Sequence, residues 1–181
     1  QAPIAFIRGK AVNYLDIMQK EAAACILRDI PHGSIHRHIM YSKLENVYKY
    51  CYVYTPPEYT CSGKEYPVIY LEHNKNEDET AWIYQGKINY IMDNMIYEGK
   101  CKKTIVVIIP RNIFRQDEEG YKVSELSRKE ILEETKEFIN KKYSVIKGSD
   151  NNIFGMNTGE DKEFTQWADE RKKFAEYIQI I

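Results

Sequence analysis

The most informative segment of this 181-residue chain is Asn151-Asn152-Ile153-Phe154-Gly155-Met156-Asn157-Thr158-Gly159-Glu160. An apolar pair, Ile153 and Phe154, leads into a segment in which two glycines bracket a central residue. Glycine allows a sharp backbone turn and a close approach of the neighbouring elements. An acidic run that is compatible with a helix follows. The stretch therefore predicts a strand, a tight turn and a helix in succession, with Asn157 at the tip of the turn.

The same layout defines the nucleophile elbow, whose pattern is Gly-x-Ser-x-Gly with the serine held at the tip of a strained turn. In this chain the tip residue is Asn157. A carboxamide has no nucleophilic oxygen that a neighbouring base can activate. The sequence therefore predicts the scaffold of a nucleophile elbow without its nucleophile.

The composition is that of an ordinary globular protein with one sizeable core. Hydrophobic residues make up 43% of the chain and charged residues 29%, and the formal net charge is −1. This balance does not favour binding to nucleic acid or to an anionic membrane. No apolar run approaches the roughly 20 residues that a membrane-spanning helix needs. Because the chain starts at Gln1, we expect a processed or trimmed product.

The cysteines and histidines form no metal-binding pattern. The four cysteines are Cys25, Cys51, Cys61 and Cys101, and their spacings match no zinc motif. Cys51 and Cys61 flank a Pro-Pro turn, so they fit either a disulfide bond or two isolated buried thiols. His36 and His38 are two residues apart in a β-like run and therefore point to the same side. Without a third ligand nearby, we expect them to be structural or to face solvent.

Strand-like and helix-like patterns alternate along most of the chain. We expect an N-terminal helix over Ala11–Leu27, a hairpin of Ile35–Ser42 and Val47–Tyr54 with a turn at Leu44–Asn46, buried strands at Pro67–Leu71 and Thr104–Pro110, helices at Ile88–Ile96 and Ser124–Tyr143, a polar loop over 111–123, a helix over 160–172 and a terminal strand over 175–181. This order predicts a layered α/β domain with a mostly parallel sheet after an opening antiparallel hairpin. We expect residues 1–28 to be a helical extension or linker and residues 29–181 to be the domain.

Several runs resemble a known family in order and spacing. The matching runs are Asp29–Gly33, Tyr52–Tyr59, Tyr66–His73, Glu77–Trp82, Ile91–Lys100, Ile105–Pro110, Gly155–Gly159 and Lys173–Ala175. Together they resemble the esterase branch of the α/β-hydrolase superfamily, in particular feruloyl and acetyl-xylan esterases and the relatives of esterase D. The resemblance implies an α/β-hydrolase-like three-layer sandwich that lacks the last strands. It also implies secretion, a plant cell-wall carbohydrate or feruloyl ester as partner, a part in xylan degradation, and no metal or organic cofactor.

The resemblance assigns positions in the candidate site. Asn157 occupies the nucleophile position, and the backbone N–H groups of Thr158 and Asn74 occupy the oxyanion-hole positions. The family carries a glycine-rich run after the residue equivalent to His73, whereas this chain has Asn74, Lys75 and Asn76. His73 and Trp82 are candidate ligand-binding residues.

The catalytic acid and histidine of the family follow the serine along the chain. Here all four histidines precede Asn157, and 24 residues follow it. The sequence therefore predicts a catalytically inactive domain, which could still bind a carbohydrate or an ester. One alternative is an active serine hydrolase with an unrecognised site, for which Ser124, Ser127, Ser144, Ser149 and Cys101 are the candidates. Another is an assembly role, in which the terminal run Tyr177–Ile181 forms an exposed sheet edge that pairs with a second copy.

Overall fold

A computed structural model of the chain describes residues 4–7, 10–13, 24–73, 78–110, 115–117, 120–122, 128–146 and 152–155. The strands are β1 (Ile4–Ile7), β2 (Lys10–Asn13), β3 (Ser34–Ser42), β4 (Val47–Thr55), β5 (Val68–Glu72), β6 (Ile105–Ile108), β7 (Arg115–Asp117), β8 (Gly120–Lys122) and β9 (Asn152–Gly155). The helices are α1 (Tyr59–Ser62), α2 (Ala81–Tyr84), α3 (Ile88–Tyr97) and α4 (Arg128–Lys142). No helix within these ranges has the length and apolar character needed to cross a membrane.

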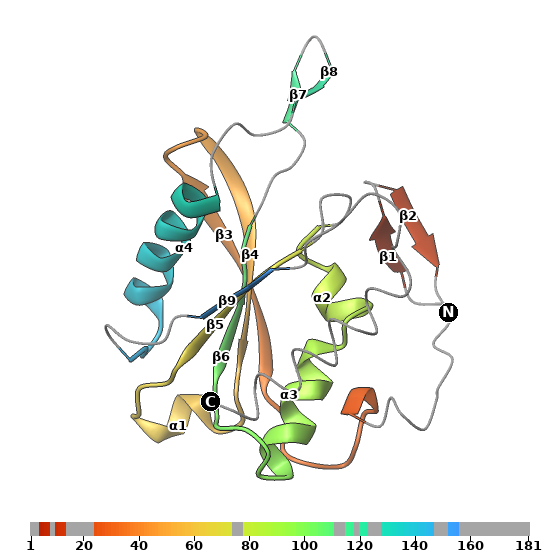
Figure 1. The fold of residues 1–181 in the computed structure, drawn as a ribbon, viewed down its shortest axis with the longest axis vertical. Helices are drawn as coiled ribbons and strands as arrows, with labels where there is room; N and C mark the ends of the chain where they lie inside the picture. Colours follow the sequence, from red (N-terminus) through yellow and green to blue (C-terminus); the bar gives the residue numbers. More distant parts are fainter. Residues whose placement is uncertain are drawn as a thin grey trace.

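The central sheet has five strands in the order β3-β4-β6-β5-β9 (Figure 1). β4 is antiparallel to both of its neighbours, β3 and β6, whereas β5 is parallel to β6 and to β9. All strands of this sheet except β4 therefore run in one direction. The mostly parallel sheet with an opening antiparallel hairpin, predicted from the sequence, is confirmed.

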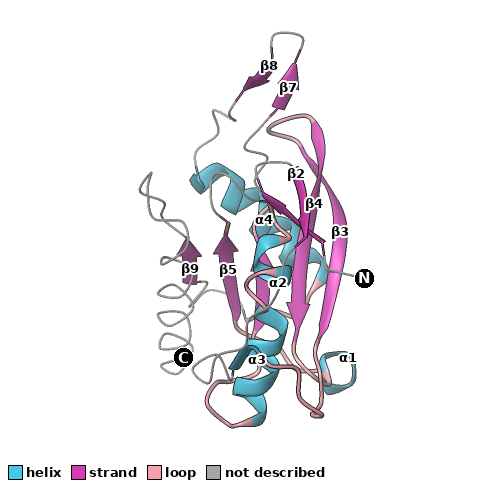
Figure 2. Ribbon diagram, turned by 90° about the vertical axis from the view of Figure 1, so that its right-hand side faces the viewer, coloured by secondary structure: helices cyan, strands magenta, loops and turns pink. Residues whose placement is uncertain are grey.

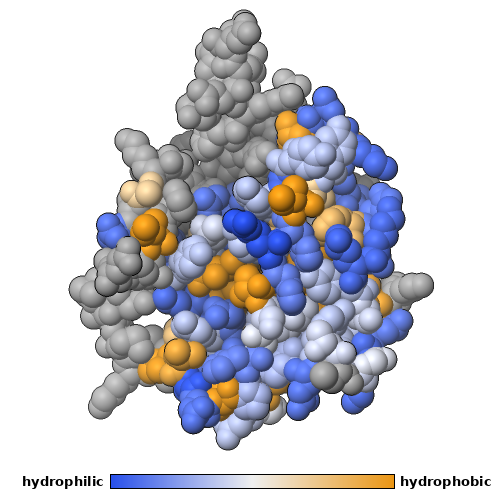
Figure 3. All heavy atoms as spheres, turned by 180° about the vertical axis from the view of Figure 1, so that it is seen from behind, coloured by the Kyte–Doolittle hydropathy of each residue, from blue (hydrophilic) through white to orange (hydrophobic). Residues whose placement is uncertain are grey.

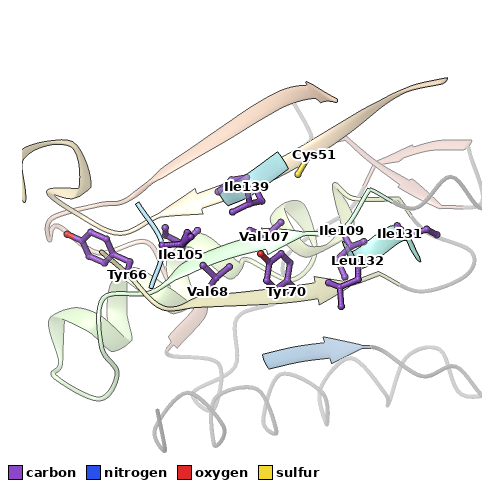
Figure 4. Close-up of a cluster of buried hydrophobic side chains, with 12 residues drawn as sticks. Cys51, Tyr66, Val68, Tyr70, Ile105, Val107, Ile109, Ile131, Leu132 and Ile139 are labelled. Atoms are coloured by element: carbon purple, nitrogen blue, oxygen red, sulfur yellow. The ribbon is translucent and has the colours of Figure 1, made fainter. Parts of the chain in front are cut away.

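Helices cover both faces of the sheet and make a three-layer structure. α2 and α3 lie on one face of the sheet (Figure 2). Their buried residues form a cluster with Tyr54, Leu71 and Val106 of the sheet. On the other face, α4 packs through Ile131, Leu132 and Ile139, as Figure 4 shows for these side chains against the sheet. Every residue of β5 and β6 is buried, which explains why both strands read as continuous apolar runs.

The β3–β4 hairpin forms where the sequence predicts it. Its ladder pairs Ser34 with Thr55 at one end and Ser42 with Val47 at the other. The turn contains Asn46 with a φ of 56°, a left-handed conformation that asparagine tolerates better than most residues. The consecutive prolines after Thr55 end the ladder, because proline has no N–H to donate.

Two expectations are wrong. The helix over Ala11–Leu27 is not formed at its start, where Lys10–Asn13 is strand β2 and pairs with β1. Such a short apolar pattern fits a strand as well as a helix, and pairing with β1 decides between them. The polar loop over 111–123 contains the β7–β8 hairpin. Of the two alternatives for Cys51, a disulfide bond or an isolated buried thiol, the structure shows the free, buried thiol.

Candidate functional site

The candidate site lies at the carboxyl ends of the parallel strands β5 and β9. Glu72 and Gly155, the last residues of these parallel strands, are register partners. β5 and β9 therefore end at neighbouring positions, at Glu72 and Gly155. Ligand sites of open α/β sheets form at the carboxyl ends of the strands. The residues predicted for the oxyanion hole and the nucleophile position, Asn74, Asn157 and Thr158, follow these strand ends in sequence and lie outside the described residues.

The first turn after the predicted oxyanion loop is built by Asp78. Its carboxylate accepts hydrogen bonds from the backbone N–H of Thr80 at 2.8 Å and from the Thr80 hydroxyl at 2.5 Å. The Ala81 N–H donates to the Asp78 carbonyl oxygen at 3.1 Å. These bonds form the turn that leads directly into α2.

Trp82 attaches α2 to the end of β5. Its indole N–H donates to the Glu72 carbonyl oxygen at 3.1 Å, and the ring is fully buried in the cluster beneath α3. Trp82 therefore acts on the candidate site by positioning the end of β5, and its ring is not presented to solvent as a stacking surface. His73 is also buried, with 1% of its surface exposed. Both residues that the sequence predicted lie beside the candidate site, but both are buried and support its structure.

Near these strand ends lie two buried titratable groups that the sequence analysis did not identify. Glu79 is 9% exposed, and its burial, with the charge of Asp78 as a further cause, raises the pKa of its carboxyl group to about 7. Burial lowers the pKa of Lys49 on β4, while the charges of Glu134 and Glu79 oppose that shift. Lys49 also forms an ion pair with Glu45. A lysine within an outward alternation of tyrosines, Tyr48-Lys49-Tyr50, is the pattern that could have revealed it.

The histidine pair on β3 is structural. His36 and His38 stack with their ring centroids 6.3 Å apart, on the side that faces α4. The His38 Nε2 lies 2.5 Å from the Tyr143 hydroxyl, and the His36 Nε2 lies 3.0 Å from the Thr55 hydroxyl. Burial lowers the pKa of His38, with the nearby charge of Lys142 as the second cause. Within the described ranges, no group of three potential metal ligands exists.

The alternative nucleophiles find no support in the described part of the chain. Burial raises the pKa of Cys101 to about 12, so its thiol stays protonated near neutral pH. The backbone of Ser144 is engaged with Tyr59 and Tyr66, since its N–H donates to the Tyr59 hydroxyl at 2.8 Å and its carbonyl accepts from Tyr66 at 3.0 Å. Ser124, Ser127 and Ser149 lie outside the described residues, as does the predicted terminal edge Tyr177–Ile181.

A polar network that the sequence did not reveal lies at the opposite end of the strands. Asp93 is 2% exposed and accepts hydrogen bonds from the Tyr54 hydroxyl and the Gly33 N–H, each at 2.8 Å. Its second oxygen lies 2.9 Å from the Nδ1 of His32. Tyr54 pairs with Val106 near the start of β6, which places this network away from the elbow. A carboxylate among the apolar residues of α3 was the available signal.

The strand order, the reversed second strand and the two helical layers define an α/β-hydrolase fold. The family described as "Putative esterase" matches residues 46–174, and the chain belongs to this family. A protein of Xylanibacter ruminicola named "Endo-1,4-beta-xylanase/feruloyl esterase" is 42% identical over 85 residues, which are 45% of this chain and 12% of that protein.

Solved structures show the same fold. One named "ferulic acid esterase" has a TM-score of 0.58 and 24% identity, and the match covers 72% of this chain and 51% of that chain. A ferulic acid esterase from Anaeromyces mucronatus, solved in complex with ferulic acid, has a TM-score of 0.60 and 18% identity over 80% of this chain and 57% of that one. The chain thus spans little more than half the length of these structures and a small part of the xylanase/feruloyl esterase.

Proposed function

We propose that this chain is an esterase-like domain that binds a hydroxycinnamoyl ester at the carboxyl ends of β5 and β9 and does not cleave it with a serine nucleophile. The observation that carries the proposal is Asn157, two residues after β9 in the motif whose tip serine forms the acyl-enzyme in such hydrolases. The ester class is taken from the printed names of the relatives, which are feruloyl and ferulic acid esterases.

An asparagine at the elbow suits binding better than cleavage. Its carboxamide can donate a hydrogen bond to a carbonyl oxygen and accept one from a hydroxyl, but it has no O–H whose removal creates a nucleophile. Backbone N–H groups of Asn74 and Thr158 would still be available to a bound ester carbonyl, because a substitution of the side chain leaves the backbone donor in place. The natural setting of such a domain would be xylan degradation outside the cell, with a feruloylated cell-wall carbohydrate as its partner.

The test compares binding with turnover in the same protein. We expect methyl ferulate to bind the unmodified chain, measured by calorimetry, without hydrolysis of methyl ferulate or p-nitrophenyl acetate above buffer. An Asn157→Ala variant should bind about five- to tenfold more weakly, the usual effect of losing one hydrogen bond. Asn140→Ala, which changes an exposed asparagine on α4, is the matched control and should bind normally.

Two results would overturn the proposal. Hydrolysis by the unmodified chain at ordinary enzyme rates, about 1 s⁻¹ or faster, would mean that a nucleophile operates elsewhere. Absence of methyl ferulate binding would show that a hydroxycinnamoyl ester is not the ligand. An Asn157→Ser variant adds information about the elbow itself: labelling of this variant, and not of the unmodified chain, by a fluorophosphonate would show that the tip position still activates a serine.

A further inference from the structure

The β3–β4 hairpin extends beyond the ends of the neighbouring strands, on the side of the sheet where the candidate site lies. Tyr52 on β4 is level with Ile108, the last residue of β6. Because β4 runs antiparallel to β6, Val47–Cys51 lie beyond that end, over a length of about 16 Å. Figures 1 and 2 show this part of the hairpin reaching past α2 and α3. The hairpin therefore forms a wall on the side of the candidate site, where β6 separates β4 from β5 and β9 lies beyond β5.

One side of this wall is rich in exposed tyrosines. Ile39 pairs with Tyr50 and Tyr41 pairs with Tyr48 across the ladder, so these four side chains share one side of the hairpin. They are 64%, 49%, 45% and 73% exposed, respectively, and we call them the tyrosine face. A hollow of about 370 Å³ is lined by Ile39, Tyr48, Lys49 and Tyr50. Around the edge strand β3, Figure 3 shows hydrophobic residues as separate spots on a largely hydrophilic surface.

The rings of the tyrosine face are held in place before any ligand arrives. The Tyr41 hydroxyl donates to the side-chain oxygen of Asn46, and the Tyr41 and Tyr48 ring centroids are 5.1 Å apart. The Arg37 guanidinium lies 5.0 Å from the centroid of the Tyr50 ring. Preorganised side chains lose little conformational entropy on binding, which favours affinity.

The chemistry of the tyrosine face matches a neutral, polyhydroxylated chain. Aromatic rings offer flat apolar surfaces to the C–H faces of sugar rings, and phenolic hydroxyls offer hydrogen bonds at their rims. Three of its four residues are tyrosines. The two neighbouring cations are already engaged, since Arg37 lies over Tyr50 and Lys49 is paired with Glu45. The face therefore presents no acidic group and no unshared cation that would select a charged ligand. Tyrosine and arginine are also enriched in protein–protein interfaces, so association with a second copy of the chain is the alternative that the experiment must distinguish.

We propose that the tyrosine face binds the neutral polysaccharide backbone to which the ester is attached. This inference rests on the proposed function, because a polysaccharide would lie beside the carboxyl ends of β5 and β9 only if its ester group binds there. The face would hold the backbone while the ester reaches the ends of β5 and β9. Since a relative is named as a xylanase/feruloyl esterase, unesterified xylohexaose is the appropriate probe.

The test is calorimetric titration of xylohexaose into the full chain and three variants. Tyr48→Ala/Tyr50→Ala should weaken binding at least tenfold, whereas Tyr50→Phe should retain most of it because the ring remains. Tyr97→Ala is the matched control: Tyr97 is 59% exposed and also contacts an arginine, Arg28, but lies on α3. This control should bind xylohexaose like the unmodified chain. If the double variant does not fold, as judged by circular dichroism, Tyr48→Ala alone serves, because its side chain is the most exposed.

The outcomes separate this inference from the proposed function. Failure of the unmodified chain to bind xylohexaose, or equal losses in the double variant and in Tyr97→Ala, would overturn the polysaccharide site. A dimer in light scattering that disappears in the double variant, without xylohexaose binding, would assign the face to a second copy and also overturn it. The double variant should still bind methyl ferulate. If the unmodified chain binds xylohexaose and not methyl ferulate, the ester site alone is wrong.

Discussion

At the scale of single residues, the buried carboxylate of Asp93 holds together parts of the chain that are far apart in sequence. It accepts hydrogen bonds from Tyr54 on β4 and from Gly33 at the entrance to β3, and it contacts His32. Gly33 has no room for a side chain, because an added Cβ would meet the Thr55 carbonyl oxygen and the Tyr54 ring. The position of the hairpin relative to α3 therefore depends on a few atoms.

Asp93→Ala should lower the free energy of unfolding by about 3 kcal/mol, because it leaves the buried Tyr54 hydroxyl and the Gly33 N–H without an acceptor. Asp93→Asn should cost less, since the amide oxygen can still accept. Urea denaturation measures both. Asp29→Ala, at an exposed position, is the control and should change the value by less than about 0.5 kcal/mol. A loss below about 1 kcal/mol for Asp93→Ala would show that the network is not structurally important.

At the scale of elements, α4 is attached to the sheet by a narrow apolar stripe and an aromatic contact at its end. Ile131, Leu132 and Ile139 are buried against β5 and β6. At the C-terminal end, Phe138 and Tyr143 pack edge-on against His38. Their ring centroids lie 5.6 Å and 5.7 Å, respectively, from the centroid of the His38 ring. The outward positions are charged, as the pairs Glu133–Lys136 and Glu137–Lys141 show.

Ile139→Ala should destabilise the protein by about 3 kcal/mol, since it removes a fully buried side chain and leaves a cavity beneath the helix. Asn140→Ala, the next residue on the exposed side of α4, should change stability by less than about 0.5 kcal/mol. Thermal unfolding followed by circular dichroism would compare the two variants. Similar melting temperatures for both would mean that α4 is not part of the cooperative core.

At the scale of the whole molecule, the sequence predicts the layers well and the site only in part. Continuous apolar runs identify β5 and β6, and the period of Ile88, Met92 and Met95 identifies α3, because deep burial imposes a pattern that needs no partner to be recognised. Burial against a distant element leaves no such local pattern. The core role of Trp82 and the burial of Glu79 depend on how α2 returns to the sheet, so neither could be read from neighbouring residues.

The buried carboxyl group of Glu79 should make stability depend on pH. The pKa of Glu79 is about 7 in the folded protein and near its ordinary value of 4.5 in the unfolded chain, so between these values the folded protein keeps a proton that the unfolded chain has lost. The free energy of unfolding therefore falls as pH rises from about 4.5 to about 7. Glu79→Gln should raise it by about 2 kcal/mol at pH 8 and leave it nearly unchanged at pH 4.

Urea denaturation at the two pH values would measure this difference for Glu79→Gln. The control is Glu65→Gln, at an exposed position just before β5, which should show no gain at either pH. An equal gain at pH 4 and pH 8 would contradict the assignment, because the effect would then come from packing and not from ionisation.

The strand order also has a consequence for how the protein folds. β3 and β4 pair across a four-residue turn, whereas β9 pairs with β5, whose partner residues are about 80 positions away along the chain. Closing so long a loop costs more entropy than closing a hairpin, and contacts of high sequence separation slow folding. The wall that carries the tyrosine face can therefore form early and locally, whereas the carboxyl ends of β5 and β9 come together only when β9 joins the sheet. A nascent or partly unfolded chain would present the tyrosine face before β5 and β9 lie side by side.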